Sequence, residues 1–300
     1  MLFGVLLFLI KTLYLSFRKP ILKTIAEHIL FPNAKISHER LDKAISGKTI
    51  AITGASYGIG EELALLFSKH HVHLIVIART EDKLHTLAEN VKNNGSKCTV
   101  IAADLYLEIE VERVIEELKK LDSVDIFISN AGKSINRSLE DSLDRYHDFT
   151  RTNSLNYLAP IRLLLSITPQ LQAAKGQIIN VSAMNVLLPP APKWAAYQAS
   201  KTAFDQWFRG NWAEWSAMGI QAKTIYLPLV RTRMIAPNEN YENYPAMLPQ
   251  QAAVRIVRLL SSGNNISKPW WAVFAEASGF FGAALWKKYS FYRISRQYDK

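Results

Sequence analysis

The sequence has one cysteine in 300 residues, and this scarcity excludes two kinds of stabilising chemistry. Cys98 has no second cysteine for an internal disulfide, and a single thiol cannot build a cysteine-based zinc site. Both absences are typical of a reducing compartment. Low-complexity runs, internal repeats and flexible linkers are missing too, and 49% of the residues are hydrophobic against 21% charged. This composition excludes disordered and collagen-like chains and favours one folded domain with extensions.

Acidic residues are scarce at the two ends of the chain, which makes both ends basic. Residues 1–48 carry eight basic and three acidic side chains, residues 251–300 carry eight and two, and the segment between them carries 20 and 21. A nucleic-acid-binding protein would place its basic residues on a recognition element. Here they alternate with Trp, Phe, Tyr and Leu, so we expect the ends to face a membrane surface and expect no nucleic-acid partner.

No stretch of the N-terminal region is long enough for a secure membrane span. Residues 1–17 are apolar apart from two hydroxyl residues and Lys11, and as a helix they would reach about 25 Å, less than the ~30 Å hydrocarbon core. The run lacks preceding basic residues and a small-x-small site, so we expect an uncleaved anchor. Residues 21–30 place apolar side chains on one half of a helical wheel, typical of a helix in the headgroup region.

We therefore predict that residues 1–47 associate with a membrane and hold the body of the protein on its cytoplasmic, reducing side. The alternative is a hydrophobic arm that packs on the folded body. We expect that body to span residues 48–260 and to be followed by an apolar and basic extension over residues 261–300.

The body alternates short apolar runs with helical patterns. The runs, rich in β-branched residues, cover residues 48–53, 72–78, 98–103, 124–129, 177–181 and 220–227. Helical apolar spacing lies between them, at residues 59–70, 81–93 and 108–121. Fully apolar strands that alternate with helices indicate a parallel sheet covered on both faces. The expected fold class is therefore α/β, a doubly wound parallel sheet of the Rossmann type, in a single domain.

A glycine-rich turn joins the first expected strand to the first helix. It reads Thr53-Gly54-Ala55-Ser56-Tyr57-Gly58-Ile59-Gly60. Gly54 permits the tight turn, Gly58 lets the backbone approach a pyrophosphate at the helix N-terminus, and Gly60 lets helix and strand pack closely. A tight turn without a ligand is the plainer alternative. The position between strand and helix favours a dinucleotide site.

Polar residues follow the next strands at their carboxyl ends, where ligands bind in open α/β sheets. Arg79 stands about 20 residues beyond the glycines, where an NAD site would carry an Asp or Glu. An arginine suits a 2′-phosphate, which favours NADP(H) over NAD, although a solvated arginine at a strand end is the alternative. Asp104 follows the third strand, and Asn130, Ala131 and Gly132 follow the fourth.

Tyr197 and Lys201 are the residues that we expect to perform chemistry. Side chains at i and i+4 share a helix face, so the Lys201 ammonium would lie near the Tyr197 phenol and lower a pKa that is ~10 when unperturbed. The tyrosine would then be a general acid for a carbonyl oxygen that receives a hydride. Among the 12 tyrosines, only Tyr197 is followed by Lys at i+4. An exposed helix pair is the alternative.

These motifs together resemble the short-chain dehydrogenase/reductase family over roughly residues 48–237. The resemblance rests on the ordered series of the glycine-rich turn, Asp104, Asn130-Ala131-Gly132, Asn153, Ser182 and Tyr197-Gln198-Ala199-Ser200-Lys201. It implies that Tyr197 is the acid/base, that Lys201 holds the ribose and tunes the tyrosine, and that Asn153 supports a proton-relay water. It also implies cofactor contacts from Pro228, Val230 and Thr232, with Thr232 against the nicotinamide amide.

The chain departs from the family pattern in two places. The family shows two serines where this chain has Ser182 and Ala183, and the catalytic hydroxyl normally belongs to the second. The stretch to Tyr197 is one residue longer than usual, which leaves Ser182 as the candidate. Leu229 replaces a common glycine. Loss of one oxyanion donor costs ~10²–10³ in turnover, so a catalytically impaired NADPH-binding membrane protein is an alternative.

The segments around Tyr197 and Pro228 are similar to a bacterial branch of the family that reduces fatty acyl-CoA or related lipid carbonyls. The resemblance implies an NADPH-dependent reductase of a hydrophobic or acyl-CoA substrate, and a sterol or 3-keto-sphingoid reductase is the alternative within the family. The apolar residues 270–286 would cover an aliphatic chain or touch a bilayer. We expect no metal at the histidines of residues 70–73. A tryptophan cluster at residues 207–215 packs internally or forms a homo-oligomer face.

Overall fold

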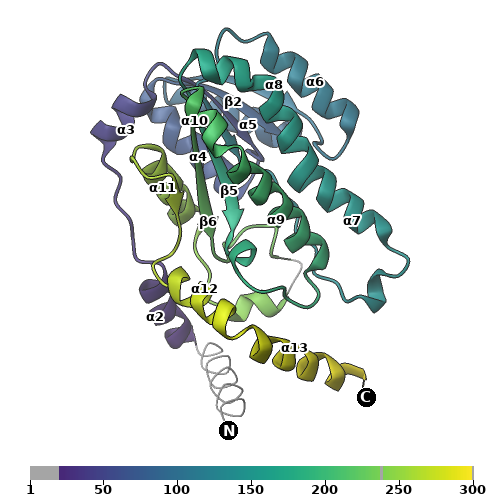
Figure 1. Ribbon diagram of the computed structural model, residues 1–300. Helices are drawn as coiled ribbons and strands as arrows, with labels where there is room; N and C mark the ends of the chain where they lie inside the picture. Colours follow the sequence, from purple (N-terminus) through teal and green to yellow (C-terminus); the bar gives the residue numbers. More distant parts are fainter. Residues whose placement is uncertain (1–19, 237–238, 299–300) are drawn as a thin grey trace.

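The computed structural model describes residues 20–236 and 239–298, and its centre is a seven-stranded parallel sheet (Figure 1). The strand order is β3-β2-β1-β4-β5-β6-β7, and every neighbouring pair is parallel. The strands are β1 (Thr49–Thr53), β2 (His73–Ala78), β3 (Lys97–Ala102), β4 (Ile126–Ser129), β5 (Gln177–Ala183), β6 (Gln221–Leu227) and β7 (Ile266–Ser267). The doubly wound parallel sheet predicted from the sequence is confirmed.

Helices cover both faces of this sheet because its strands carry apolar side chains in both directions. In β1, Ile50 and Ile52 point into one core and Ala51 points into the other. The first core is closed by α4 (Gly58–Phe67), α5 (Glu81–Asn93) and α11 (Pro249–Leu260). The second is closed by α6 (Glu108–Lys119), α8 (Ala159–Ala173), α9 (Ala195–Gly210) and α10 (Trp212–Ala217). The tryptophans at 207 and 215 pack on this second core.

The strand order reverses at β1, and this reversal positions the site. From β1 the chain winds to β2 and β3 on one side, then returns to β4, β5 and β6 on the other. The chain therefore leaves β1 and β4 in opposite directions, and a ligand crevice forms at the carboxyl edge of the sheet at such a reversal. The polar residues that follow these strands meet at this edge of the sheet.

The segment before β1 is divided between two environments. In α3 (His38–Ile45), Leu41 and Ile45 are fully buried in the first core. The folded unit thus begins before residue 48, and the expected boundary at that residue falls inside it, because the apolar face of α3 needs the body to cover it. α2 (Pro20–Leu30) lies at the other end of the molecule (Figure 1). Residues 1–17, our expected anchor, lie outside the described residues.

The C-terminal extension forms two helices, α12 (Ala272–Phe281) and α13 (Ala283–Tyr298). They run beneath the carboxyl edge of the sheet, where α12 lies next to α2 and α13 extends away from it (Figure 1). The Trp270 indole donates a hydrogen bond to the Ile29 carbonyl at 3.1 Å and joins the two extensions. Within residues 20–236 and 239–298, no helix combines the length and apolarity needed to cross a bilayer.

Candidate active site

A cavity of about 660 Å³ opens at the carboxyl ends of β1, β2, β4, β5 and β6. Most of the residues predicted from the sequence to bind a cofactor or substrate line it. They are Gly54, Ser56, Tyr57, Ile59, Arg79, Asp104, Asn130, Ala131, Gly132, Ser182, Tyr197, Lys201, Pro228, Val230 and Thr232. Segments up to about 180 residues apart thus converge on one space.

The glycine-rich turn is held tightly against the end of β4. A Cβ on Gly60 would lie 2.3 Å from the Gly54 carbonyl oxygen, and one on Gly54 would lie 2.9 Å from the Ala131 Cα. Gly54 and Gly58 also have φ of 70° and 59°, a left-handed conformation that favours glycine. Gly54 and Gly60 therefore permit the tight turn and the close packing that the sequence predicts, and a larger residue at either position would push the two loops apart. The predicted approach of the Gly58 backbone to a pyrophosphate stays a prediction, and in the structure Gly58 faces Thr232.

Thr53 and Asn130 lock the two loops together from below. The backbone N–H groups of Asn130 and Ala131 each donate to the Thr53 hydroxyl at 3.0 Å, and the Asn130 amide donates to the Thr53 carbonyl at 2.9 Å. Thr53 is buried and lies behind the cavity wall. Its role is to position the turn, so the predicted direct contact with a cofactor is corrected to an indirect one.

Arg79 lies at the end of β2 with its guanidinium over the cavity rim. The Arg79 Nη1 lies 3.5 Å from the Asp104 carboxylate, and the arginine side chain is 59% exposed. Because Asp104 contacts only one side of the exposed Arg79 guanidinium, the other N–H donors of Arg79 are available to an anion. The geometry fits a phosphate beside the ribose end of a dinucleotide.

The loop after β6 covers the glycine-rich turn. The Thr232 methyl would lie 3.0 Å from a Cβ on Gly58, so this threonine packs on the turn itself. The next residue, Arg233, stacks its guanidinium 3.6 Å from the centroid of the Tyr57 ring. Arg233 was not predicted from the sequence, because nothing in its spacing from Tyr57 shows that the two loops meet.

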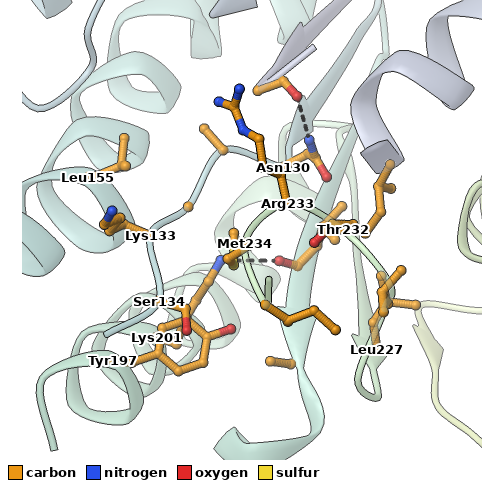
Figure 2. A pocket seen from close by; sticks show the side chains of 18 of the residues that line it. Asn130, Lys133, Ser134, Leu155, Tyr197, Lys201, Leu227, Thr232, Arg233 and Met234 are labelled. Carbon is orange, nitrogen blue, oxygen red and sulfur yellow. Dashed lines mark hydrogen bonds between the residues drawn. The ribbon is translucent and has the colours of Figure 1, made fainter. Parts of the chain in front are cut away.

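Tyr197 and Lys201 lie one turn apart on α9, and Figure 2 shows their side chains next to each other. The Lys201 ammonium donates to the Val181 carbonyl on β5 at 3.3 Å. Burial lowers the pKa of Lys201 to about 8, and Asp205 partly opposes this shift. Burial also raises the pKa of Tyr197 to about 12.

This last direction contradicts the lowered tyrosine pKa expected from the sequence. The i,i+4 spacing correctly places the two side chains on one face, but burial of the phenol outweighs the effect of a cation that is itself desolvated. Within the described protein, therefore, Tyr197 is a protonated phenol at neutral pH.

The expected asparagine is displaced by one helical turn. Asn153 ends α7 (Tyr146–Asn153) with an exposed side chain and does not line the cavity. Asn156, in the π-helical turn Ser154–Leu158 that follows, is 1% exposed. The prediction of Asn153 is corrected to Asn156, because the wide turn swings residue 156 inward.

Asn156 joins three elements around the cavity. Its amide oxygen accepts from the Lys133 N–H at 2.8 Å, and its amide nitrogen donates to the Lys133 carbonyl at 2.9 Å and to the Ser200 hydroxyl at 3.0 Å. Both its oxygen and the Lys201 ammonium approach Gly132, within 3.3 and 3.5 Å of a Cβ built there. Asn156 therefore fixes the loop after β4 relative to α9.

The strand that carries Ser182 brings an unpaired hydroxyl to the site. Ser182 is 4% exposed, and its oxygen has no hydrogen-bond partner among the described residues. Strand alternation puts Ser182 on the same face as Ile178, which packs in the core with α9. Buried hydroxyls are normally bonded, so this one is suited to an incoming acceptor. Ala183 also lines the cavity and offers no polar group.

The outer part of the cavity is apolar and aromatic. Trp194 meets the Tyr197 ring edge-on at 5.8 Å and stacks on Tyr241 at 5.9 Å. Further apolar lining comes from Leu155, Met184, Leu188, Leu227, Met234, Ile235 and Trp271. An extended hydrophobic group fits beside the tyrosine. Residues 20–236 and 239–298 contain no cluster suited to a metal ion, and His70 bonds Asp42 instead.

The site therefore has the parts of a dinucleotide-dependent dehydrogenase, and comparison with known proteins agrees. The family model for short chain dehydrogenase matches residues 48–243. The chain belongs to this family of oxidoreductases.

Curated relatives point to one branch of that family. The chain is 38% identical over 211 residues to a fatty acyl-CoA reductase of Mycobacterium tuberculosis, covering 70% of this chain and 72% of that one. It is 39% identical over 215 residues to a fatty acyl-CoA reductase of Acinetobacter baylyi, covering 71% and 72%. The resemblance stated from the sequence is confirmed.

Solved structures support the fold. A short-chain dehydrogenase from Sphingobium yanoikuyae in complex with NADPH superposes with a TM-score of 0.70 at 23% identity, covering 79% of this chain and 93% of that one. A short-chain dehydrogenase/reductase from Caenorhabditis elegans with cofactor gives 0.66 at 25% identity, covering 77% and 97%.

Proposed function

We propose that this protein is an NADPH-dependent reductase of a carbonyl carried by a long-chain acyl substrate. The observation that carries the proposal is the placement of Tyr197 and Lys201 at the inner end of an apolar, aromatic cavity. The likeness to two fatty acyl-CoA reductases supports the substrate class.

The cofactor assignment rests on the residues around the glycine-rich turn. Gly54 and Gly60 let the turn pack tightly on the loop after β4, which shapes the start of α4 where a pyrophosphate would bind, and Arg79 supplies donors at the ribose end. In the turn after β2, Arg79 occupies the position where an acidic residue would favour an unphosphorylated ribose. NADP(H) therefore fits better than NAD(H), and when bound it supplies the hydride.

The chain's own residues supply the proton and hold the substrate oxygen. Tyr197 keeps its proton at neutral pH because burial raises its pKa to about 12, so it donates to a carbonyl oxygen as negative charge develops there. The Lys201 cation lies on the same helix face and stabilises the phenolate that remains. The Ser182 hydroxyl has no partner in the described part of the chain and donates a second hydrogen bond to that oxygen.

Asn156 takes no part in the proton transfer itself and instead holds the surrounding elements in place. Its amide connects the loop that follows β4 to Ser200 in α9, next to Lys201. Asn156 takes the role that the family resemblance gave to Asn153. It holds in place the hydrogen-bonding groups that a proton-relay water would need.

A second candidate is favoured by Ala183, which stands where the family normally has its catalytic serine. In this reading the protein binds NADPH but turns over no substrate, and acts through contacts at the membrane. A sterol or 3-keto-sphingoid reductase differs from the main proposal only in substrate.

One experiment separates these functions. Detergent-solubilised protein is given NADPH with acyl-CoAs of increasing chain length, long-chain aldehydes, 3-keto lipids and steroids, and oxidation of NADPH is followed by absorbance. Turnover that increases with acyl length and is lost in Tyr197→Phe is the expected result. Turnover on steroids or 3-keto lipids alone would show that the substrate belongs to one of those classes and not to the acyl-CoAs. NADPH binding without turnover on the whole panel would overturn the reductase and favour the impaired protein.

A further inference from the structure

The helix α2 exposes a stripe of large apolar side chains, while its charged residues Lys23 and Glu27 face the protein. Leu30 also packs on the body, and Thr24 and His28 are exposed beside the apolar stripe. Lys23 donates to the Glu242 carbonyl, and Glu27 pairs with Arg231 and accepts from the Ala246 N–H. On the opposite side, Ile21, Leu22, Ile25 and Ile29 are all exposed. An ordinary surface helix does the reverse and buries its apolar stripe. The protein therefore holds α2 with its apolar side chains exposed, where a further apolar surface could cover them.

The two C-terminal helices continue this arrangement. One side of α12 packs on the body, where Ala272 is fully buried and a Cβ on Gly279 would lie 2.8 Å from the Pro189 ring. The other side of α12 exposes large apolar residues at helical spacing, and α13 exposes two more. Together with Trp270, these residues are Val273, Phe274, Phe280, Phe281, Leu285 and Phe291. We call the exposed side chains of α2 and of this set the α2–α12–α13 face.

This face combines aromatic residues with uncompensated positive charge. Lys287 and Lys288 are exposed on α13, and the sequence from 270 to 298 contains one acidic residue, Glu276, which pairs with Lys268. Lysine is depleted in protein–protein interfaces, whereas aromatic and basic residues on one helix face are typical of contact with anionic lipid. The sequence that leads into α2 is apolar as well.

Part of the cavity wall is formed or held by the same helices. The Trp286 indole donates to the Pro190 carbonyl at 2.9 Å, so α13 holds the loop that follows β5. That loop lines the cavity with Leu188 and Ala191, and Trp271, at the start of α12, lines it directly. Helices of the α2–α12–α13 face thus contact the wall of the cavity that holds Tyr197.

We propose that the α2–α12–α13 face lies on an anionic lipid bilayer, with its aromatic side chains at the headgroup boundary and the helices that contact the cavity wall resting on the lipid. The bilayer contact follows from the exposed face alone. Only the passage of substrate from lipid to cavity rests on the proposed function, so the two are tested separately.

The single cysteine makes a direct test available. In a Cys98→Ser background, an environment-sensitive fluorophore is attached at Phe281→Cys or Phe274→Cys, residues that are 85% and 69% exposed. The matched control is Ile109→Cys, 78% exposed on α6 at the opposite end of the molecule (Figure 1). The full-length chain is mixed with vesicles of phosphatidylcholine, with and without phosphatidylglycerol, and recovery by flotation is measured in parallel.

The expected result is a blue shift and increased emission at 274 and 281, not at 109, with vesicles that contain phosphatidylglycerol. Phe274→Ser combined with Phe281→Ser should weaken binding to these vesicles about tenfold or more, while Ile109→Ser leaves it unchanged. Flotation without any response at 274 and 281 would overturn the proposal, because another part of the chain would then hold the vesicle. A response that depends on protein concentration without lipid would overturn it in favour of a second copy. None of these readouts requires turnover.

Discussion

The Lys201 ammonium donates a hydrogen bond to the Val181 carbonyl at 3.3 Å, in a site where burial lowers the lysine pKa to about 8. The folded protein therefore holds a cation where it is poorly solvated. A pKa below the unfolded value means that the charged form opposes folding, fully below pH 8 and less and less up to about 10.5.

Replacing Lys201 with Met should consequently stabilise the protein while removing its activity. We expect the free energy of unfolding at pH 7 to rise by about 1–3 kcal/mol, less than the full shift because Asp205 and the Val181 bond offset part of it. The gain should shrink as pH approaches 10. Denaturant unfolding of both proteins across pH measures this. A stability loss at pH 7 would show that the ammonium is well compensated.

Tyr197→Phe removes the proton donor and little else. The ring still packs edge-on against Trp194, so stability and NADPH binding should stay within about twofold, while turnover falls by ~10³ or more. For the native enzyme, a tyrosine pKa of about 12 implies that reduction does not lose its acid between pH 6 and 9, so a fall in rate above about pH 8 would report loss of the Lys201 charge instead. Cofactor fluorescence titration and a pH–rate profile check both statements, and full residual turnover in Tyr197→Phe would exclude the phenol as the acid.

The fold was predictable because both periodicities are strong in this chain. The run at 74–78 is continuously apolar and buried, and α5 and α6 lie where this continuous apolar pattern gives way to apolar residues spaced about 3.6 apart. β7 was missed, since the two residues Ile266–Ser267 carry no period. Asn156 was missed because two asparagines lie three residues apart, and only the π-helical turn decides which one faces inward. The predicted lowering of the Tyr197 pKa was wrong because sequence spacing carries no information on desolvation.

Arg79 should decide the choice between the two nicotinamide cofactors. Charge-assisted hydrogen bonds to a phosphate contribute about 1.5–3 kcal/mol, so Arg79→Ala should raise KM for NADPH about 10- to 100-fold and leave that for NADH unchanged. Lys83→Ala, another basic change near the end of β2, is the matched control. Equal effects of Arg79→Ala on the two cofactors would show that Arg79 contacts no 2′-phosphate.

The two asparagines give a direct comparison of the sequence-based and structural assignments. Asn156→Ala leaves the Lys133 N–H without its acceptor and the Lys133 carbonyl and Ser200 hydroxyl without the amide donor, so we expect a loss of about 2–3 kcal/mol in stability and about 10² in kcat. Asn153→Ala changes an exposed side chain, so the stability should stay nearly unchanged and kcat should stay within about twofold of the native value. Thermal unfolding and steady-state kinetics of the pair would contradict the assignment if Asn153→Ala were the damaging change.

Ser182 and Ala183 decide whether this chain is an active enzyme or has lost a catalytic group. Because the Ser182 hydroxyl is buried, unpaired among the described residues and on the α9 side of β5, Ser182→Ala should lower kcat by ~10²–10³ with little change in KM or NADPH binding. Ala183→Ser, in the same strand, is its counterpart. If Ala183→Ser raised turnover while Ser182→Ala had no effect, the polarising hydroxyl would belong at 183. The native protein would then lack it, as the NADPH-binding alternative requires, and kcat measured for the two single variants and the double variant separates these outcomes.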